Sequence, residues 1–170
     1  MDRKRVAVIS TGNAGQAMAG YFAHKGYSVS LYAREQERVD MFPSNRLCLG
    51  GIVSAKARAR VISCHMGEVL EGAFLVMVTT PAQYHAIVAR AMAPFLKDGQ
   101  IVVLNPGRTL GTYVFDKTLR ESGCAADVTV AETDTLIFTC RSTSIGCTEI
   151  YSIKRGVQVA AHIPERTPIV

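Results

Sequence analysis

The stretch RVAVISTGNAGQAMAG, residues 5–20, decides the fold of this chain. Its first five residues, RVAVI, form an apolar run rich in β-branched residues with no charge after Arg5, as a strand covered on both faces requires. Residues 14–25 then place small and apolar side chains on one face, which predicts a helix. Ser10, Gly12 and Gly15 lie between the two, at the spacing of a GxGxxG turn. Strand, turn and helix in this order predict the start of a Rossmann-type domain.

The turn between this strand and helix is the expected binding site for the pyrophosphate of a dinucleotide. Gly12 lets the main chain approach the phosphates, Gly15 lets the helix pack closely on the strand, and the free N–H groups of the helix start attract an anion. Ser10 replaces the first glycine, and we expect it to be tolerated through a negative φ. The alternative is a tight turn that binds nothing. The candidate cofactor contacts in the turn are Ser10, Thr11, Gly12, Asn13, Ala14 and Gly15.

The residue after the second expected strand, residues 27–32, indicates which dinucleotide is bound. NAD-binding domains carry an acid there, which accepts hydrogen bonds from the ribose 2′-OH. This chain has Arg34 instead, with Arg38 nearby. A guanidinium pairs with a 2′-phosphate, so the sequence favours NADP, with NAD as the alternative. The run REQER, residues 34–38, is also consistent with a solvated turn that neutralises its own charge.

The rest of the chain continues the alternation of strands and helices. Thr80 is expected to cap the second long helix, with Pro81 at its first position. The signal is weak over residues 35–62, where a short strand is expected. Beyond residue 127 only short strand candidates occur. The remaining predicted elements are strands 73–78, 101–104, 128–131, 136–139, 150–153 and 157–160 and helices 81–96 and 111–121. This pattern predicts an α/β, doubly wound, mostly parallel sheet with helices on both faces and a short C-terminal β-meander.

Length and composition indicate one globular domain. The chain has 170 residues, 48% of them hydrophobic, and a net charge of +5, which favours anionic ligands. The one basic cluster, residues 3–5, is interpreted as a solvated lead-in, so we expect no nucleic acid partner. Five dispersed cysteines argue against a disulfide framework or a zinc site and favour the cytoplasm. No apolar run is long enough to span a membrane. We expect a domain over residues 1–162 and a linker over residues 163–170.

Three further segments carry a resemblance to a known family. They are VMVTTPAQYH at residues 76–85, NPG at residues 105–107 and AETDTLIFTCR at residues 131–141. With the glycine turn, they make nearly the whole chain similar to the N-terminal domain of the octopine and nopaline (opine) dehydrogenases. The resemblance implies an NAD(P)H-dependent reductive condensation of an amino acid with an α-keto acid, through an imine that receives hydride.

The resemblance also implies site residues and a second domain. Thr80 and Pro81 would border the nicotinamide ribose, and Asn105 and Glu132 would lie near the cleft. The family places its catalytic histidine and aspartate on a following helical domain, so we assign no catalytic residue here. The chain is then either a shortened form of an enzyme or a natural single domain. If the helical domain is missing, the cleft face exposes apolar surface and we expect the chain to self-associate as a homo-oligomer.

Two other classes of protein share the cofactor turn. One is another two-domain oxidoreductase of the prephenate, ketopantoate or glycerol-3-phosphate dehydrogenase type. The other is a nucleotide-sensing Rossmann module without catalysis, like the regulatory domains of potassium channels. Such sensors usually keep an acid after the second strand, so Arg34 argues against this reading.

The remaining polar residues give no further site. Four isolated histidines show no metal-ligand spacing, so no metal is expected. His85 is the most interesting of them, although a partly buried helix histidine is favoured over a proton donor or a substrate contact. Arg141 is either a carboxylate ligand or a salt-bridged strand residue. Cys140 and Cys147 are expected to fill the core. The histidines are His24, His65, His85 and His162.

Overall fold

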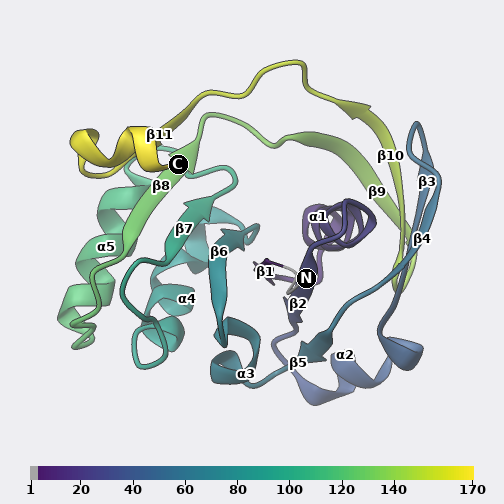
Figure 1. The fold of residues 1–170 in the computed structure, drawn as a ribbon, viewed down its shortest axis with the longest axis horizontal. Helices are drawn as coiled ribbons and strands as arrows, with labels where there is room; N and C mark the ends of the chain where they lie inside the picture. Colours follow the sequence, from purple (N-terminus) through teal and green to yellow (C-terminus); the bar gives the residue numbers. More distant parts are fainter. Residues whose placement is uncertain (1–3) are drawn as a thin grey trace.

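The main feature of the computed structural model, which describes residues 4–170, is a seven-stranded sheet (Figure 1). Arg3 of the basic cluster lies outside the described residues. The strand order is β11-β8-β7-β6-β1-β2-β5, parallel except for β11. From β5 to β8 this is the Rossmann order 3-2-1-4-5-6. The strands are β1 (Arg5–Ile9), β2 (Ser28–Tyr32), β5 (Val61–Ser63), β6 (Ala73–Val78), β7 (Ile101–Leu104), β8 (Thr129–Thr133) and β11 (Val159–Ala161).

Helices cover both faces of this sheet, as expected. In β1, Ala7 and Ile9 pack with the helices of one face, and Val6 and Val8 pack with α1 on the other. All four side chains are fully buried, which explains the absence of polar alternation in this strand. One face carries α1 (Asn13–His24), and the other carries α3 (Met66–Leu70), α4 (His85–Met92) and α5 (Gly111–Glu121).

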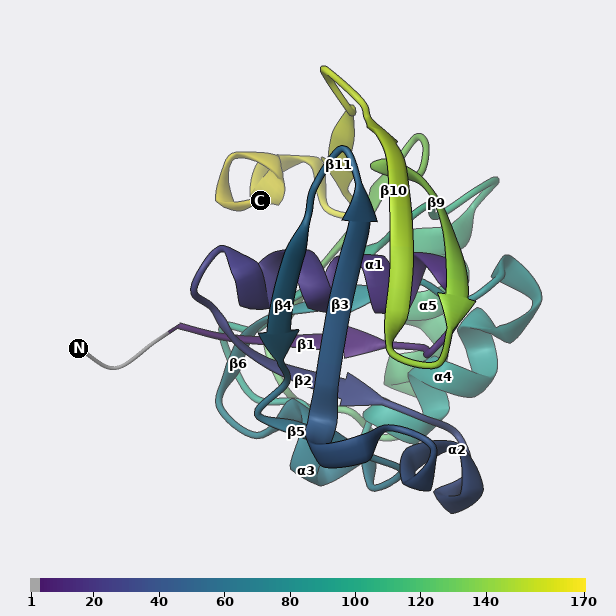
Figure 2. The same cartoon turned by 90° about the vertical axis from the view of Figure 1, so that its right-hand side faces the viewer.

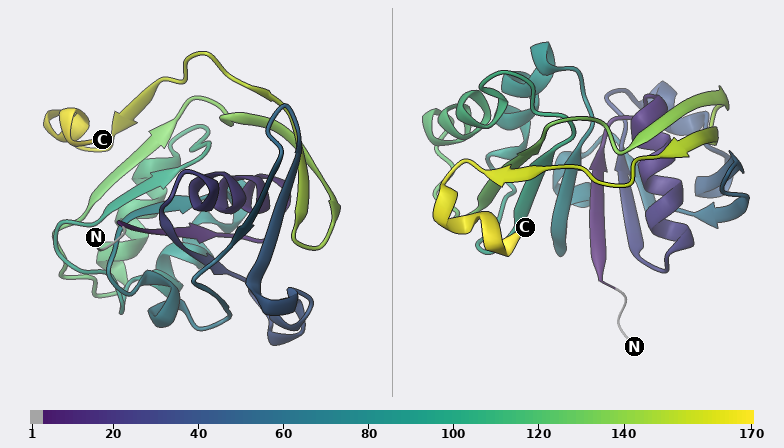
Figure 3. Two further views of the ribbon diagram at one scale, coloured as in Figure 1. Left: turned by 45° about the vertical axis from the view of Figure 1, so that its right-hand side comes forward. Right: turned by 90° about the horizontal axis from the view of Figure 1, so that it is seen from above.

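A second, four-stranded sheet lies against the outer side of α1, in the order β4-β3-β10-β9 (Figure 2). The expected C-terminal strands therefore divide between two sheets. The β9–β10 hairpin pairs with β3, whereas β11 returns to β8. Figure 3 shows the long excursion of the chain from β8 to this sheet and back. The strands are β3 (Arg46–Gly51), β4 (Ala55–Arg58), β9 (Phe138–Ser144) and β10 (Cys147–Ile153), and the short helices α2 (Gln36–Asp40) and η1 (Pro43–Asn45) precede them.

Three local features differ from the sequence-based expectation. The helix expected over residues 81–96 is a 3-10 turn, η2 (Ala82–Tyr84), followed by the shorter α4. The last residues are packed rather than free, because η3 (Pro164–Ile169) contacts β8 and β11. Cys48 and Cys147 form a disulfide between β3 and β10, with Cα atoms 4.5 Å apart. The wide spacing of the cysteines had argued against such a bond, but the fold brings this pair into register.

Neither a membrane span nor a metal cluster is found among residues 4–170. None of the helices there is long and apolar enough to cross a bilayer. No three His, Cys, Asp or Glu side chains of this part of the chain gather as metal ligands.

Candidate functional site

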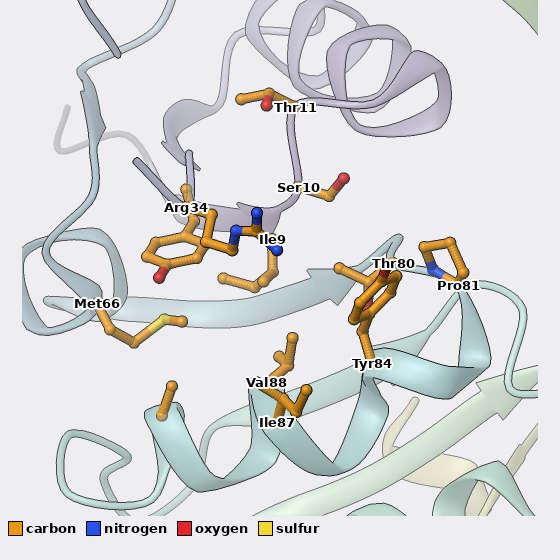
Figure 4. Close-up of a pocket in the computed structure, with 12 residues that line it drawn as sticks. Ile9, Ser10, Thr11, Arg34, Met66, Thr80, Pro81, Tyr84, Ile87 and Val88 are labelled. Atoms are coloured by element: carbon orange, nitrogen blue, oxygen red, sulfur yellow. The ribbon is translucent and has the colours of Figure 1, made fainter. Parts of the chain in front are cut away.

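A pocket of about 320 Å³ opens at the carboxyl ends of β1, β2 and β6 (Figure 4). The strand order reverses between β1 and β6, and ligands of open α/β sheets bind at such a point. The glycine turn forms one wall and α4 the opposite wall. The lining residues are Ile9, Ser10, Thr11, Tyr32, Arg34, Met66, Thr80, Pro81, Tyr84, Ile87, Val88 and Ala91.

The two glycines of the turn serve different purposes. A Cβ on Gly15 would lie 1.9 Å from the carbonyl oxygen of Ser10, so the protein itself requires glycine there. A Cβ on Gly12 would meet only the Ser10 Oγ, at 3.4 Å, and the φ of Gly12 is an ordinary −71°. No protein atom demands glycine at position 12. The open space beside it is what a closely approaching phosphate needs.

Ser10 has a φ of 123°, so the expectation of a negative φ is wrong. L-residues rarely adopt this conformation, which explains why the fingerprint has glycine here. The Ser10 Oγ accepts a hydrogen bond from the Gly12 N–H at 3.1 Å. This bond supports the turn but also occupies one N–H donor where we expect the phosphate to bind.

The start of α1 is free to attract an anion and is held from the side by the second sheet. The helix has no side-chain cap and no acidic residue in its first turn, so only the Ser10 Oγ, on the Gly12 N–H, would compete there with an anion. Gln16 donates to the Thr11 carbonyl at 2.8 Å and accepts from the Gly146 N–H at 2.7 Å. Asn13 Oδ1 accepts from the Ser142 N–H at 3.0 Å. The sequence did not predict these contacts between α1 and the second sheet, because a glutamine in a helix is usually exposed to solvent.

Arg34 lies at the pocket, as predicted, and is also paired with its neighbour. Its guanidinium makes two hydrogen bonds to Glu35, at 2.7 and 3.1 Å, and this pairing raises the pKa of Arg34. The side chain remains 77% exposed, so the exposed pair contributes little to stability. Arg38 donates to the Oγ1 and the carbonyl oxygen of Thr11 and thereby joins α2 to the glycine turn. The pairing with Glu35 agrees with a turn that neutralises its own charge, and the preference for NADP stays a prediction.

Thr80 and Pro81 line the pocket, but Thr80 does not cap a helix. Pro81 occupies the capping position of η2, and the buried Thr80 Oγ1 has no partner among the described residues. A buried hydroxyl without a partner is costly unless a ligand or water satisfies it. The apolar residues Tyr84, Ile87 and Val88 complete this wall. Sequence reasoning missed them because they look like any apolar helix face.

Asn105 and Glu132 lie outside the pocket, at the ends of β7 and β8. Asn105 is 1% exposed and donates to the Thr133 Oγ1 at 2.8 Å. Glu132 accepts from the Thr112 N–H at 2.9 Å and so anchors the start of α5. Each of them thus has an internal partner, although the buried Asn105 Oδ1 has none among residues 4–170. Arg141 is exposed on β9, in register with Glu149, and is likewise outside the pocket.

His85 is buried beside this polar group. It is 1% exposed, and its Nε2 has no hydrogen-bond partner in the described part of the chain. Burial lowers the pKa of His85, and the backbone of Thr80 and the Glu132 carboxylate oppose this shift only in part. Burial therefore favours the neutral form of this imidazole, which lies between the pocket wall and α5.

The fold and the pocket together define a Rossmann-type dinucleotide-binding domain. The profile of the family described as the NAD binding domain of 6-phosphogluconate dehydrogenase matches residues 5–124. The chain belongs to this family of NAD-binding domains.

The comparisons with individual proteins confirm the resemblance to opine dehydrogenases. The chain is 33% identical over 162 residues to an opine dehydrogenase of Arthrobacter sp. (strain 1C), a match that covers 94% of this chain and 45% of that protein. A glycerol-3-phosphate dehydrogenase of Nitratidesulfovibrio vulgaris (strain DP4) is 34% identical over 102 residues, or 58% of this chain and 30% of that protein. This chain thus spans less than half the length of either relative.

Solved structures show the same fold. Octopine dehydrogenase in complex with NADH and agmatine superposes with a TM-score of 0.83 at 23% identity, covering 93% of this chain and 42% of that one. Yersinopine dehydrogenase with bound NADP+ gives a TM-score of 0.71 at 14% identity, covering 94% and 41%. The fold is therefore that of dehydrogenase domains seen with either dinucleotide.

Proposed function

We propose that this chain is the cofactor half of an opine-type oxidoreductase and prefers NADP(H) to NAD(H). The observation that carries the preference lies at the end of β2, where Arg34 enters the pocket. No acidic side chain lines the pocket to accept from a ribose 2′-OH, since Glu35 is turned to Arg34. A guanidinium matches two oxygens of a phosphate, so a 2′-phosphate can replace Glu35 as its partner.

The residues of the turn fit a dinucleotide. The space beside Gly12 and the uncapped start of α1 suit the pyrophosphate, and the unpaired Thr80 hydroxyl suits a polar group further along the cofactor. The bound nicotinamide would supply hydride to an imine. The role of this chain is to bind and orient it, with Ser10 to Gly15, Arg34, Thr80 and Pro81 as the proposed contacts. Asn105 and Glu132 then act by holding the strand ends and α5 beside the cleft.

The opine-type reaction is favoured over the glycerol-3-phosphate type by the extent of the similarity. The opine dehydrogenase match covers 94% of the chain, against 58% for the other relative. The substrates are then an amino acid and an α-keto acid in the cytoplasm. The catalytic groups and most substrate contacts belong to the part of the relative outside this similarity. We therefore expect the chain alone to bind NADPH without oxidising it when both substrates are added; NADPH oxidation would instead place catalytic groups in this chain.

The test of the cofactor proposal is calorimetric titration of the chain with NADPH and, separately, with NADH. We expect tighter binding of NADPH, and Arg34→Asp should reverse the preference because the new carboxylate repels a 2′-phosphate and accepts from a 2′-OH. Arg155→Asp is the matched control, since Arg155 is exposed in the loop after β10 and the charge change is the same. An unchanged preference in Arg34→Asp would refute the role of Arg34. Absence of binding of both nucleotides would refute the site.

An apolar surface near the cleft supports a partner for this face. At the start of α5, Leu110, Tyr113 and Val114 are 66%, 50% and 41% exposed. Large exposed apolar side chains in one place are typical of an interface. We propose that a helical domain covers this face in an opine-type enzyme and that the chain alone self-associates through it. Light scattering tests this, and a monomer at all concentrations would contradict it.

A further inference from the structure

A second pocket, of about 620 Å³, lies on the four-stranded sheet and shares no lining residue with the cofactor pocket. The β3–β4 hairpin and the β9–β10 turn form it. Its polar lining consists of three cationic side chains, Arg46, Lys56 and Arg58, and of the bonded pair Cys48 and Cys147. Nothing in the proposed function uses this pocket.

The three cations lie together without acidic partners. Arg46 and Arg58 are directly opposite each other on antiparallel strands, and like charges in that position repel. Among residues 4–170, no salt bridge and no side-chain hydrogen bond is made by Arg46, Lys56 or Arg58. Glu149 of the neighbouring strand is in register with Gly50 and Arg141 and does not line the pocket. An anion in the pocket would relieve this repulsion.

The cysteines are within reach of such an anion. Cys48 and Cys147 are register partners on β3 and β10, half-buried, and both line the pocket. Lys56 is in register with Cys48 on the other side. Positive charge near a thiol favours the thiolate, which is the reactive form. Two of the three other cysteines differ: Cys124 is buried, and burial raises the pKa of the Cys140 thiol.

We propose that this pocket is a thiol–disulfide exchange site for small anionic thiols and disulfides. In the oxidising direction, one protein thiolate attacks the reagent disulfide RS–SR, whose S–S bond breaks and releases RS⁻. The second protein thiolate then attacks the protein sulfur of this mixed disulfide, forms the Cys48–Cys147 bond and releases a second RS⁻. The protein loses two electrons and two thiol protons, and RS–SR becomes two RSH. The carboxylates of the reagent bind the three cations.

The experiment compares an anionic and a neutral oxidant on the reduced 170-residue chain. Oxidised glutathione is the anionic probe and 2-hydroxyethyl disulfide the neutral one, and peptide mass mapping after acid quenching follows formation of the Cys48–Cys147 cross-link. The measured quantity is the ratio of the two rates. We expect Lys56→Gln and Arg58→Gln each to lower this ratio about threefold, the effect of one charge at about 6 Å in a water-like dielectric. Added salt should lower it as well.

Arg141→Gln is the control, since it removes a cation of the same sheet outside the pocket and should leave the ratio unchanged. The proposal is overturned if the ratio is the same in the wild type, Lys56→Gln and Arg58→Gln. It is also overturned if both reagents modify Cys64 or Cys140 while the pair stays reduced. These readouts need no dinucleotide, so they are independent of the cofactor proposal.

Discussion

Replacement of Gln16 by Leu tests whether the second sheet holds the glycine turn. Gln16 is 2% exposed and bridges the Thr11 carbonyl and the Gly146 N–H. Leu has a similar volume but makes neither bond, so the Gly146 N–H loses its partner and the Thr11 carbonyl keeps only the Arg38 guanidinium. An unsatisfied buried peptide group costs about 1–3 kcal/mol, so we expect a loss of about 2 kcal/mol. At about 2–4 °C per kcal/mol, the thermal midpoint falls by about 4–8 °C.

Two further variants separate the positioning role from general stability. Gln100 is also buried, but its bonds to Leu70 and Ala73 lie at the opposite end of the sheet. We expect Gln100→Leu to lower the melting temperature and leave the NADPH affinity of the folded chain unchanged. Gln16→Leu should lower both. Gln16→Glu keeps an acceptor for Gly146 but sets a carboxylate against the Thr11 carbonyl, so it too should weaken NADPH binding.

The melting curves and calorimetric titrations can refute this reasoning in two ways. A Gln16→Leu chain within about 1 kcal/mol of the wild type would show that the two bonds contribute little. Equal NADPH affinity in the Gln16→Leu and Gln100→Leu chains would show that the turn holds its conformation without the second sheet.

Four other outcomes follow from the same structure. Gly15→Ala should abolish NADPH binding in a titration, because its Cβ would lie 1.9 Å from a carbonyl oxygen; retained affinity would contradict this. Ser10→Gly should raise the melting temperature, since relief of the 123° φ, about 1–3 kcal/mol, exceeds the entropic cost of glycine, about 0.5–1 kcal/mol, and water can replace the Ser10 Oγ at the exposed Gly12 N–H. A lower midpoint would argue against strain. Burial lowers the pKa of His85, so below about pH 6.5 the unfolded chain binds a proton at this residue more readily than the folded chain does. The free energy of unfolding, measured in urea, should therefore fall as the pH drops below about 6.5. His85→Phe should flatten this dependence, and an equal slope would assign it to another group. Reduction of the disulfide, whose cysteines are 99 residues apart, should lower the free energy of unfolding by about 2–4 kcal/mol, and equal denaturant midpoints would contradict this.

The main sheet could be predicted from the sequence because its signals are local. The apolar runs of β1, β6 and β7 stand between helical patterns, and this alternation implies a parallel sheet. The second sheet has no such alternation, although strands were expected over residues 136–139 and 150–153, which overlap β9 and β10. Its central pair, β3 and β10, joins segments far apart in the chain, and β4 reads AKAR, a pattern too short and too charged to indicate a strand. The pairing of β3 with β10 depends on the outer surface of α1, against which both strands pack.

The candidate site, too, could be predicted from the sequence only in part. Ser10, Thr11, Arg34 and the Thr80–Pro81 pair could be placed at the pocket because they follow directly on predicted strands, and strand ends converge at one sheet edge. The roles of Gln16, Tyr84 and Ile87 could not be predicted, since their sequence neighbours do not reveal which distant surface they face. The φ of Ser10 was also inaccessible, because it follows from the close approach of Gly15 to the Ser10 carbonyl.

The second sheet makes the glycine turn less autonomous than its motif indicates. If the turn contacted only β1 and α1, its conformation would depend on main-chain geometry and on the Ser10 hydroxyl. Here Thr11 also receives bonds from Gln16 and Arg38, and Gln16 in turn is held by Gly146. Gly146 directly precedes Cys147, so the disulfide lies one residue from the bond that supports the turn. The sheet that covers α1 therefore also determines where the N–H groups at the start of α1 lie, and substitutions in β3 or β10 should affect cofactor affinity without touching the pocket.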